Sequence, residues 1–167
     1  MVTPVDTARA VAAAVPDPEL PMLTLADLGI LRDVEVADGR VVVSVTPTYS
    51  GCPAMTEIRR DVAARLTAAG FEDVEVRTVL HPAWTTDWVT DEGRRKLAGA
   101  GISPASAAPA PTGGRVPLTL GPTRRAVTCP RCGSADTVLT SPFGATACRA
   151  LYRCRQCSEP FEHMKEI

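Results

Sequence analysis

The stretch Arg40–Arg60, RVVVSVTPTYSGCPAMTEIRR, contains the signals from which most of the fold can be predicted. Its first part, Arg40–Thr46, is rich in β-branched residues and predicts a central strand. Its last part begins an amphipathic helix, because apolar residues recur there at helical spacing, at Met55, Ile58, Val62, Leu66 and Ala69. Gly70 predicts the end of that helix. The turn Gly51–Pro53 separates the strand from the helix.

Alternating elements are predicted on both sides of this stretch. A helix capped at Thr3 runs to about Ala14, and the prolines of PDPELP then force an extended turn. The Asp38-Gly39 pair predicts a hairpin turn. The remaining elements are two strands and a short helix, at Leu31–Val36, at Val74–Leu80 and from Thr90 to Gly99 or Gly101. The order α-β-β-α-β-α predicts a small α/β domain with a three-stranded mixed sheet.

Residues 103–124 are rich in Pro, Ala, Gly and Ser and predict a flexible linker. We therefore expect an N-terminal domain at 1–102 and a C-terminal domain at 125–167. Residues 1–123 carry 11 basic and 15 acidic residues, a net charge of −4. Residues 124–167 carry seven basic and four acidic residues, a net charge of +3. The C-terminal part is thus mildly basic.

Two C-x-x-C motifs in the C-terminal part predict a metal site. Their cysteines are Cys129, Cys132, Cys154 and Cys157, and 21 residues separate the two motifs. This spacing is close to that of zinc ribbons, in which two knuckles present four thiolates to a structural Zn²⁺. An iron–sulfur cluster in the same shell is the alternative. The whole chain is therefore predicted to be α+β, its small α/β domain followed by a β-rich zinc ribbon.

Cys148 is a fifth thiol in this part of the chain. It either replaces one of the four ligands or packs separately on the ribbon. We expect three nearby arginines to offset the negative charge of the site; they are Arg149, Arg153 and Arg155.

Cys52 stands apart from the other cysteines, between a glycine and a proline. Pro53 is expected to be the first helical residue, with Cys52 or Ser50 near the cap. The N-terminus of a helix favours the thiolate, which is the nucleophilic and metal-binding form of cysteine. Gly51 would allow a tight turn that leaves the sulfur accessible. A buried structural cysteine is the alternative interpretation.

Composition narrows the functional classes. The net charge is −1 and no apolar run has the roughly 18 residues of a membrane span. The N-terminus does not have the pattern of a secretory signal, so we expect a cytoplasmic protein with no membrane partner. No catalytic triad, phosphate loop or dinucleotide motif is present, which argues against an enzyme that acts alone. A charge of +3 in the ribbon, with few aromatic residues, is weak support for nucleic-acid binding.

Four motifs of the N-terminal part resemble the SufT-like iron–sulfur-assembly domain. They are DPE at Asp17–Glu19, LADLGIL at Leu25–Leu31, TPTYSGCP at Thr46–Pro53 and LHPAWTTDWVTDEGRRKLAG at Leu80–Gly99. The resemblance implies a role in maturation of iron–sulfur proteins, with Cys52 as the reactive or metal-binding residue. Asp17 and Glu19 are candidate supporting residues, although capping of the loop is their simpler role.

The sequence from Cys129 to Lys165 resembles the ribbon of the PaaD family of phenylacetate degradation. Cys148 is part of that family's pattern. The resemblance implies an accessory protein of the phenylacetyl-CoA epoxidase, with Cys52 transiently holding iron or an iron–sulfur cluster and Zn²⁺ holding the ribbon. The partners implied are the oxygenase and reductase subunits or iron–sulfur assembly proteins, and a homodimer stays open. The alternative is a structural or regulatory subunit that transfers no metal.

Overall fold

The computed structural model describes residues 3–105 and 127–166. These residues form two compact units, which divide between Ala100 and Gly101. The first unit contains α1 (Pro4–Ala13), β1 (Leu31–Ala37), β2 (Arg40–Val45), α2 (Met55–Ala68), β3 (Asp73–Thr78), the 3-10 helix η1 (Thr86–Trp88) and α3 (Asp91–Gly99). The second unit contains β4 (Ile102–Ser103), β5 (Thr137–Ser141), β6 (Arg149–Cys154) and β7 (Pro160–Met164). No helix of the described residues is long and apolar enough to cross a membrane.

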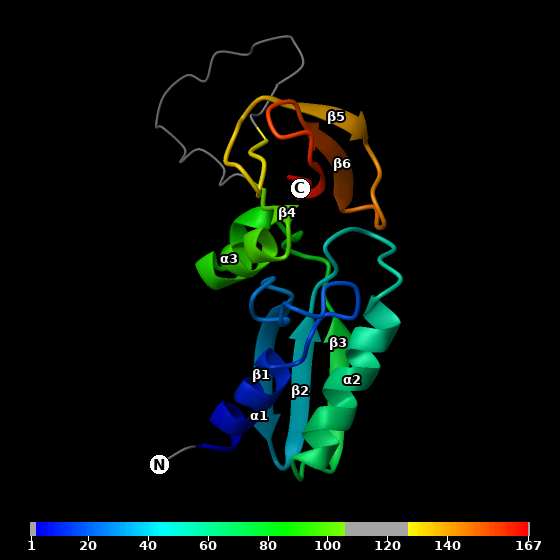
Figure 1. The fold of residues 1–167 in the computed structure, drawn as a ribbon. Helices are drawn as coiled ribbons and strands as arrows, with labels where there is room; N and C mark the ends of the chain where they lie inside the picture. The colour runs from blue at the N-terminus through cyan, green and yellow to red at the C-terminus, as the bar shows by residue number, and fades with distance from the viewer. Residues whose placement is uncertain (1–2, 106–126, 167) are drawn as a thin grey trace, which may run out of the picture. The chain divides into compact units, whose positions relative to one another are not determined.

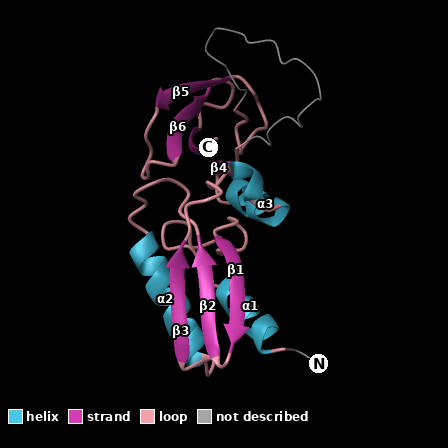
Figure 2. Ribbon diagram, turned by 180° about the vertical axis from the view of Figure 1, so that it is seen from behind, coloured by secondary structure: helices cyan, strands magenta, loops and turns pink. Residues whose placement is uncertain are grey.

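The first unit has the predicted three-stranded mixed sheet. β2 lies in the middle, antiparallel to β1 and parallel to β3. α1 and α2 cover one face of the sheet (Figure 2). The core lies between the sheet and the helices. Every second residue of β2 is buried there, and so is the apolar side of α2. The β2 residues are Val41, Val43 and Val45, and the α2 residues are Ile58, Val62 and Leu66. The predicted α+β fold class is therefore confirmed.

Local signals at the element ends explain most of these boundaries. Thr3 and Asp6 form a capping box at the start of α1, where each side chain accepts the other's backbone N–H. Asp38 and Gly39 both have positive φ, 51° and 81°, as a tight two-residue hairpin turn requires. β3 is shorter than predicted and ends at Thr78. Leu80, which alternation would have placed in the strand, lies beyond it and is 66% exposed.

The loop that precedes β1 is fastened to the segment that follows β3. Trp84 is buried, and its indole Nε1–H donates to the carbonyl oxygen of Leu28 at 2.8 Å. Asp27 accepts from Thr90 N through its carbonyl oxygen at 2.9 Å. Its carboxylate forms a 2.7 Å ion pair with Lys96 Nζ on α3. These contacts join two of the sequence motifs that carry the resemblance into one packed structure.

Two glycines allow this close approach. Gly29 has a φ of +66°, and a Cβ placed there would lie 2.6 Å from both Cβ and the carbonyl oxygen of Trp88. Gly93 is on α3, and a Cβ there would lie 2.7 Å from the carbonyl oxygen of Asp27. Any larger residue at either position would therefore push the two segments apart.

The second unit is a four-stranded sheet with the order β4-β7-β6-β5. β5, β6 and β7 are successively antiparallel, whereas β4 comes from before the Pro-rich segment and pairs parallel with β7. Ile102 and Ser103 are buried in this pairing, and His163 Nδ1 lies 3.2 Å from the carbonyl oxygen of Ser103. The second unit begins at Gly101, so β4 belongs to it although β4 precedes the Pro-rich segment. Most of the expected linker at 103–124 lies outside the described residues.

Candidate functional site

The four cysteines of the C-x-x-C motifs lie on two tight turns of the second unit. In the first turn, Gly133 has a φ of +74° and its N–H donates to the carbonyl oxygen of Cys129 at 2.9 Å. In the second turn, Cys154 N donates to the carbonyl oxygen of Glu159 at 2.9 Å, and Ser158 has a φ of 64°. The two turns bend the backbone so that the cysteine side chains converge.

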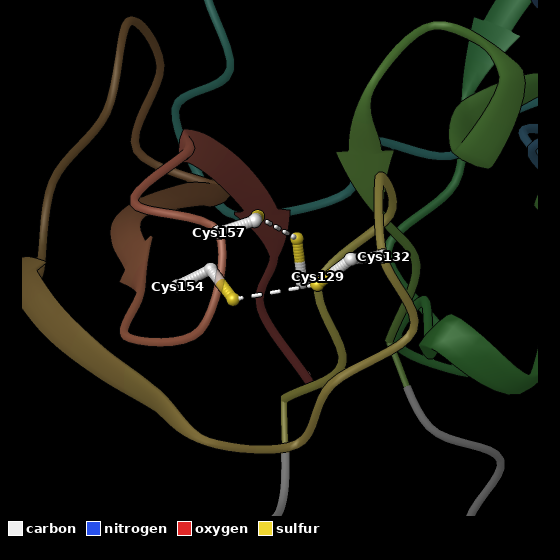
Figure 3. A group of neighbouring side chains, drawn as sticks. All are labelled: Cys129, Cys132, Cys154 and Cys157. Atoms are coloured by element: carbon white, nitrogen blue, oxygen red, sulfur yellow. Dashed lines mark hydrogen bonds between the residues drawn. The ribbon is translucent and has the colours of Figure 1, made fainter.

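The four sulfurs lie within 4.8 Å of one another. Two close contacts run between the two turns, with Cys129 Sγ 3.8 Å from Cys157 Sγ and Cys132 Sγ 3.6 Å from Cys154 Sγ (Figure 3). A tetrahedral Zn²⁺ with Zn–S bonds of about 2.3 Å separates its sulfurs by about 3.8 Å. The donor set and its spacing therefore fit a tetrahedral metal ion held by four thiolates.

Within the cluster, the pKa values of two of the cysteines are shifted in opposite directions. The backbone N–H of Cys157, helped by that of Gln156, lowers the pKa of Cys154 to about 7. The N–H of Ser134 acts in the same direction on Cys132, but burial and the three other sulfurs prevail and raise its pKa to about 12. Without a metal, the cluster thus retains protons that a divalent cation would displace.

The cysteine cluster also affects the pKa of Arg131, a residue of the first C-x-x-C motif. Its carboxylate partner Glu159 raises the pKa of its guanidinium, and the negative charges of Cys157 and Cys129 add to that effect. Arg149 and Arg155, expected in this role, pair instead with Glu162 and Asp136. The position of Arg131 inside the first C-x-x-C motif was the signal for it, because a residue in a knuckle stays beside the metal site.

Cys148 is outside the group of four sulfurs. Its side chain is buried, and its Sγ lies 3.0 Å from Oγ1 of Thr146. Its carbonyl oxygen accepts from Lys165 N at 2.9 Å. The structure therefore places this thiol in the packing of β6 and the loop before it.

Cys52 lies in the turn between β2 and α2, where the sequence placed it. Gly51 has a φ of +90°, which confirms the predicted tight turn, and the cysteine is half-buried. The prediction that Pro53 begins the helix is wrong. α2 begins at Met55 after the cap Ala54, because the first bond of α-helical spacing runs from Ile58 N to the carbonyl oxygen of Ala54 at 2.9 Å.

A tighter turn joins Cys52 to the start of α2. The carbonyl oxygen of Cys52 accepts from Met55 N at 3.3 Å, and its own N–H donates to the carbonyl oxygen of Tyr49 at 3.2 Å. No side chain caps α2. The thiol therefore lies about one turn before the helix rather than at its cap, on a backbone fixed by hydrogen bonds on both sides.

Asp17 and Glu19 lie in the loop before β1. Asp17 is buried, and its Oδ1 accepts the backbone N–H groups of Glu19 and Leu20 at 2.9 and 2.8 Å. This is the loop-capping role that the sequence suggested as the simpler one. The hydrogen bond from Thr46 N to the carbonyl oxygen of Ile30, at 3.0 Å, brings this loop and the Cys52 turn to the same end of the sheet (Figure 1).

Two family models match the chain. The iron–sulfur cluster assembly protein model matches residues 6–78, and the PaaD zinc beta ribbon domain model matches residues 114–165. Over 158 residues the chain is 46% identical to an Escherichia coli K12 protein named as a subunit of a "Putative 1,2-phenylacetyl-CoA epoxidase", covering 95% of this chain and 90% of that protein. The chain belongs to the PaaD family. The predicted resemblance is thereby confirmed, and both parts of this PaaD-family chain have a recognised counterpart.

Two further matches cover about half of the chain. A Porphyromonas gingivalis protein named "Fe-S protein maturation auxiliary factor" is 35% identical over 83 residues, which are 48% of this PaaD-family chain and 78% of that protein. The crystal structure of a domain of unknown function, DUF59, from Bacillus anthracis matches with a TM-score of 0.52 at 28% identity. The match covers 56% of this chain and 90% of that structure. Each of these two matches thus covers about half of this chain and most of the other one.

Proposed function

We propose that this chain is a non-catalytic maturation protein of the phenylacetyl-CoA epoxidase system. It would assist assembly of an iron–sulfur or iron centre, with Cys52 as the thiol that receives the iron or cluster. The observation that carries the proposal is the combination of two parts in one chain. A domain of the iron–sulfur assembly family is joined to a ribbon of PaaD type, and a relative that matches nearly the whole chain bears the name of an epoxidase subunit.

The geometry around Cys52 supports a role in transient binding. The thiol is half-buried on a turn whose conformation Gly51 makes possible, so a partner can reach it without unfolding the domain. Iron and iron–sulfur clusters are held by thiolates. In this proposal the iron or cluster is cargo, which Cys52 holds and then passes to a client protein.

The four-cysteine cluster has the separate role of holding the ribbon together. Cys129, Cys132, Cys154 and Cys157 would bind a structural Zn²⁺, because four thiolates leave no open coordination position for a substrate. The core of this unit is small and includes two of the cysteines themselves, Cys129 and Cys154. Metal binding would therefore supply much of the unit's stability. Six cysteines without a disulfide fit a reducing compartment such as the cytoplasm.

Replacement of Cys52 by serine tests the carrier role. The epoxidase components are produced with wild-type protein or with Cys52→Ser, purified without oxygen, and analysed for iron and acid-labile sulfide. We expect less iron in the client with Cys52→Ser, while the variant keeps its own zinc and fold. Cys148→Ser is the matched control, since it removes a thiol that is buried elsewhere. Full loading of the client by Cys52→Ser would exclude a carrier role for this thiol.

A structural or regulatory subunit is the second candidate, and the printed name of the Escherichia coli relative, an epoxidase subunit, favours it. In that case the protein would remain in a stoichiometric complex with the epoxidase. Epoxidase activity and iron content would then be the same with Cys52→Ser as with wild-type protein. Size-exclusion chromatography of the co-produced components, combined with the iron analysis, separates the two candidates.

A further inference from the structure

The described part of the second unit exposes four large apolar side chains. One of them, Leu139, is the partner of Tyr152 and points to the side of the sheet opposite Val138. The other three lie on β5, on β6 and in the loop between these strands, outside the metal site. Val138 and Leu151 are each 37% exposed and Phe143 is 65% exposed. Leu151 and Arg153 are two residues apart on β6 and so point to the same side of the sheet. Val138 on β5 is the direct partner of Arg153, which places it on that side too. The loop with Phe143 leaves β5 at Ser141, opposite Leu151.

The loop that presents Phe143 is held by several hydrogen bonds. Ser141 Oγ donates to the carbonyl oxygen of Phe143 at 2.8 Å, and Gly144 N donates to the carbonyl oxygen of Arg149 at 2.9 Å. Glu162 fastens the other side, accepting from Ala145 N at 3.2 Å and forming a 2.6 Å ion pair with the buried Arg149. An exposed aromatic ring on a fixed loop loses little conformational entropy when a partner covers it.

Two cations near these side chains are in none of the ion pairs of the described residues. Among the described residues of the second unit, Arg131, Arg149 and Arg155 each pair with a carboxylate. Arg153 and Lys165 have no such partner among the ion pairs of the described residues. Arg153 lies beside Val138, and Lys165 Nζ lies 4.7 Å from the centre of the Phe143 ring. Each cation therefore lies next to one of the exposed apolar side chains.

We infer that Val138, Phe143, Leu151, Arg153 and Lys165 form a docking face, here called the Phe143 face, for another protein subunit of the epoxidase. The inference rests on the proposed function for the identity of that partner. The partner's surface should contain an apolar pocket for the Phe143 ring, with carboxylates at its rim opposite Arg153 and Lys165. Aromatic and arginine side chains are the residues that most often dominate protein interfaces.

A protein partner fits this face better than nucleic acid does. Nucleic-acid binding depends on neutralising many phosphates, whereas this face has two cations around an apolar centre. A second copy of the chain would also have to supply carboxylates to both cations. Charge complementarity therefore favours an acidic protein surface, and the other two occupants become outcomes of the test.

Binding of purified protein to the purified epoxidase oxygenase complex and, separately, to its reductase subunit tests the inference. Phe143→Ala should raise the Kd for one of the two about tenfold or more, as loss of an aromatic anchor does. Arg153→Glu should slow association, most clearly at low salt. Arg95→Glu is the matched control, because Arg95 is exposed on α3 of the first unit and already pairs with Glu92; it should change the Kd less than about twofold. Zinc content of each variant verifies that the ribbon is folded.

Unchanged affinity of both Phe143→Ala and Arg153→Glu would overturn the inference, as would failure of wild-type protein to bind either component. It is also overturned if these variants instead abolish a dimer of the chain itself, or its binding to a DNA duplex. The proposed function fails separately. If Cys52→Ser loads the client fully while the Phe143-face variants weaken binding, the carrier role is excluded and the docking face stands. If Cys52→Ser lowers loading while these variants bind normally, the reverse holds.

Discussion

Replacement of Gly29 by alanine should destabilise the first unit strongly, for two separable reasons. The backbone at Gly29 has a φ of +66°, a left-handed conformation that costs a residue with a Cβ about 1–2 kcal/mol. The new Cβ would also lie 2.6 Å from two atoms of Trp88, one of them a backbone oxygen that cannot rotate away. Forced repacking of this kind costs about 1–3 kcal/mol more. The expected loss in free energy of unfolding is therefore about 2–5 kcal/mol.

Gly70→Ala is the control that separates the two costs. Gly70 also has a positive φ, +96°, but no atom lies within 4 Å of the Cβ that it would gain. Its loss should therefore be limited to the conformational cost, about 1–2 kcal/mol. Both tryptophans of the chain, Trp84 and Trp88, are in the first unit, so urea unfolding followed by tryptophan fluorescence reports on that unit alone. Equal shifts of the unfolding midpoint for the two variants would refute the contact between Gly29 and Trp88.

Three other perturbations have defined outcomes. Trp84→Phe leaves the carbonyl oxygen of Leu28 without its 2.8 Å donor, and thermal unfolding should show a loss of about 1–3 kcal/mol. Cys157→Ser, or a strong chelator, should remove the ribbon's metal and its β-sheet circular dichroism while tryptophan fluorescence stays native, as metal analysis of the same samples would check. Burial alone would raise the pKa of Asp27, but its bonds to Lys96 and Thr24 hold that pKa below the ordinary 3.8. The ionised Asp27 carboxylate therefore stabilises the fold fully above pH 3.8, and this stabilisation is lost as the pH falls through the lower pKa of the folded state. In Asp27→Asn, the free energy of unfolding should fall less steeply with acidification between about pH 6 and pH 2.

Features that depend on residues close together in the chain could be predicted from the sequence. A run of β-branched residues identified β2, helical spacing identified α2, and Asp38-Gly39 identified the hairpin, because each signal lies within one element. The spacing of the C-x-x-C motifs likewise predicted which four sulfurs converge. In the first three cases the residues that determine the structure are neighbours in the chain, and in the fourth they form two short motifs of a known spacing.

The features that the sequence did not predict depend on contacts between distant residues. The ion pair of Asp27 with Lys96 spans 69 positions, and neither residue carries a sign of its partner. β4 has two residues, too few for any periodic pattern, and it is a strand only because β7 lies beside it. The start of α2 was predicted two residues too early, because the rule for proline at the first helical position does not detect the tighter turn that precedes Met55.

The pairing of β4 with β7 determines how the ribbon can be isolated as a fragment. A fragment cut at the compositional boundary, beginning near residue 125, would lack Ile102 and Ser103 and expose the edge of β7 that they cover. A fragment beginning at Gly101 would keep all four strands of the sheet. Solubility trials that compare these two starting points would show whether those few residues decide if the ribbon remains monodisperse.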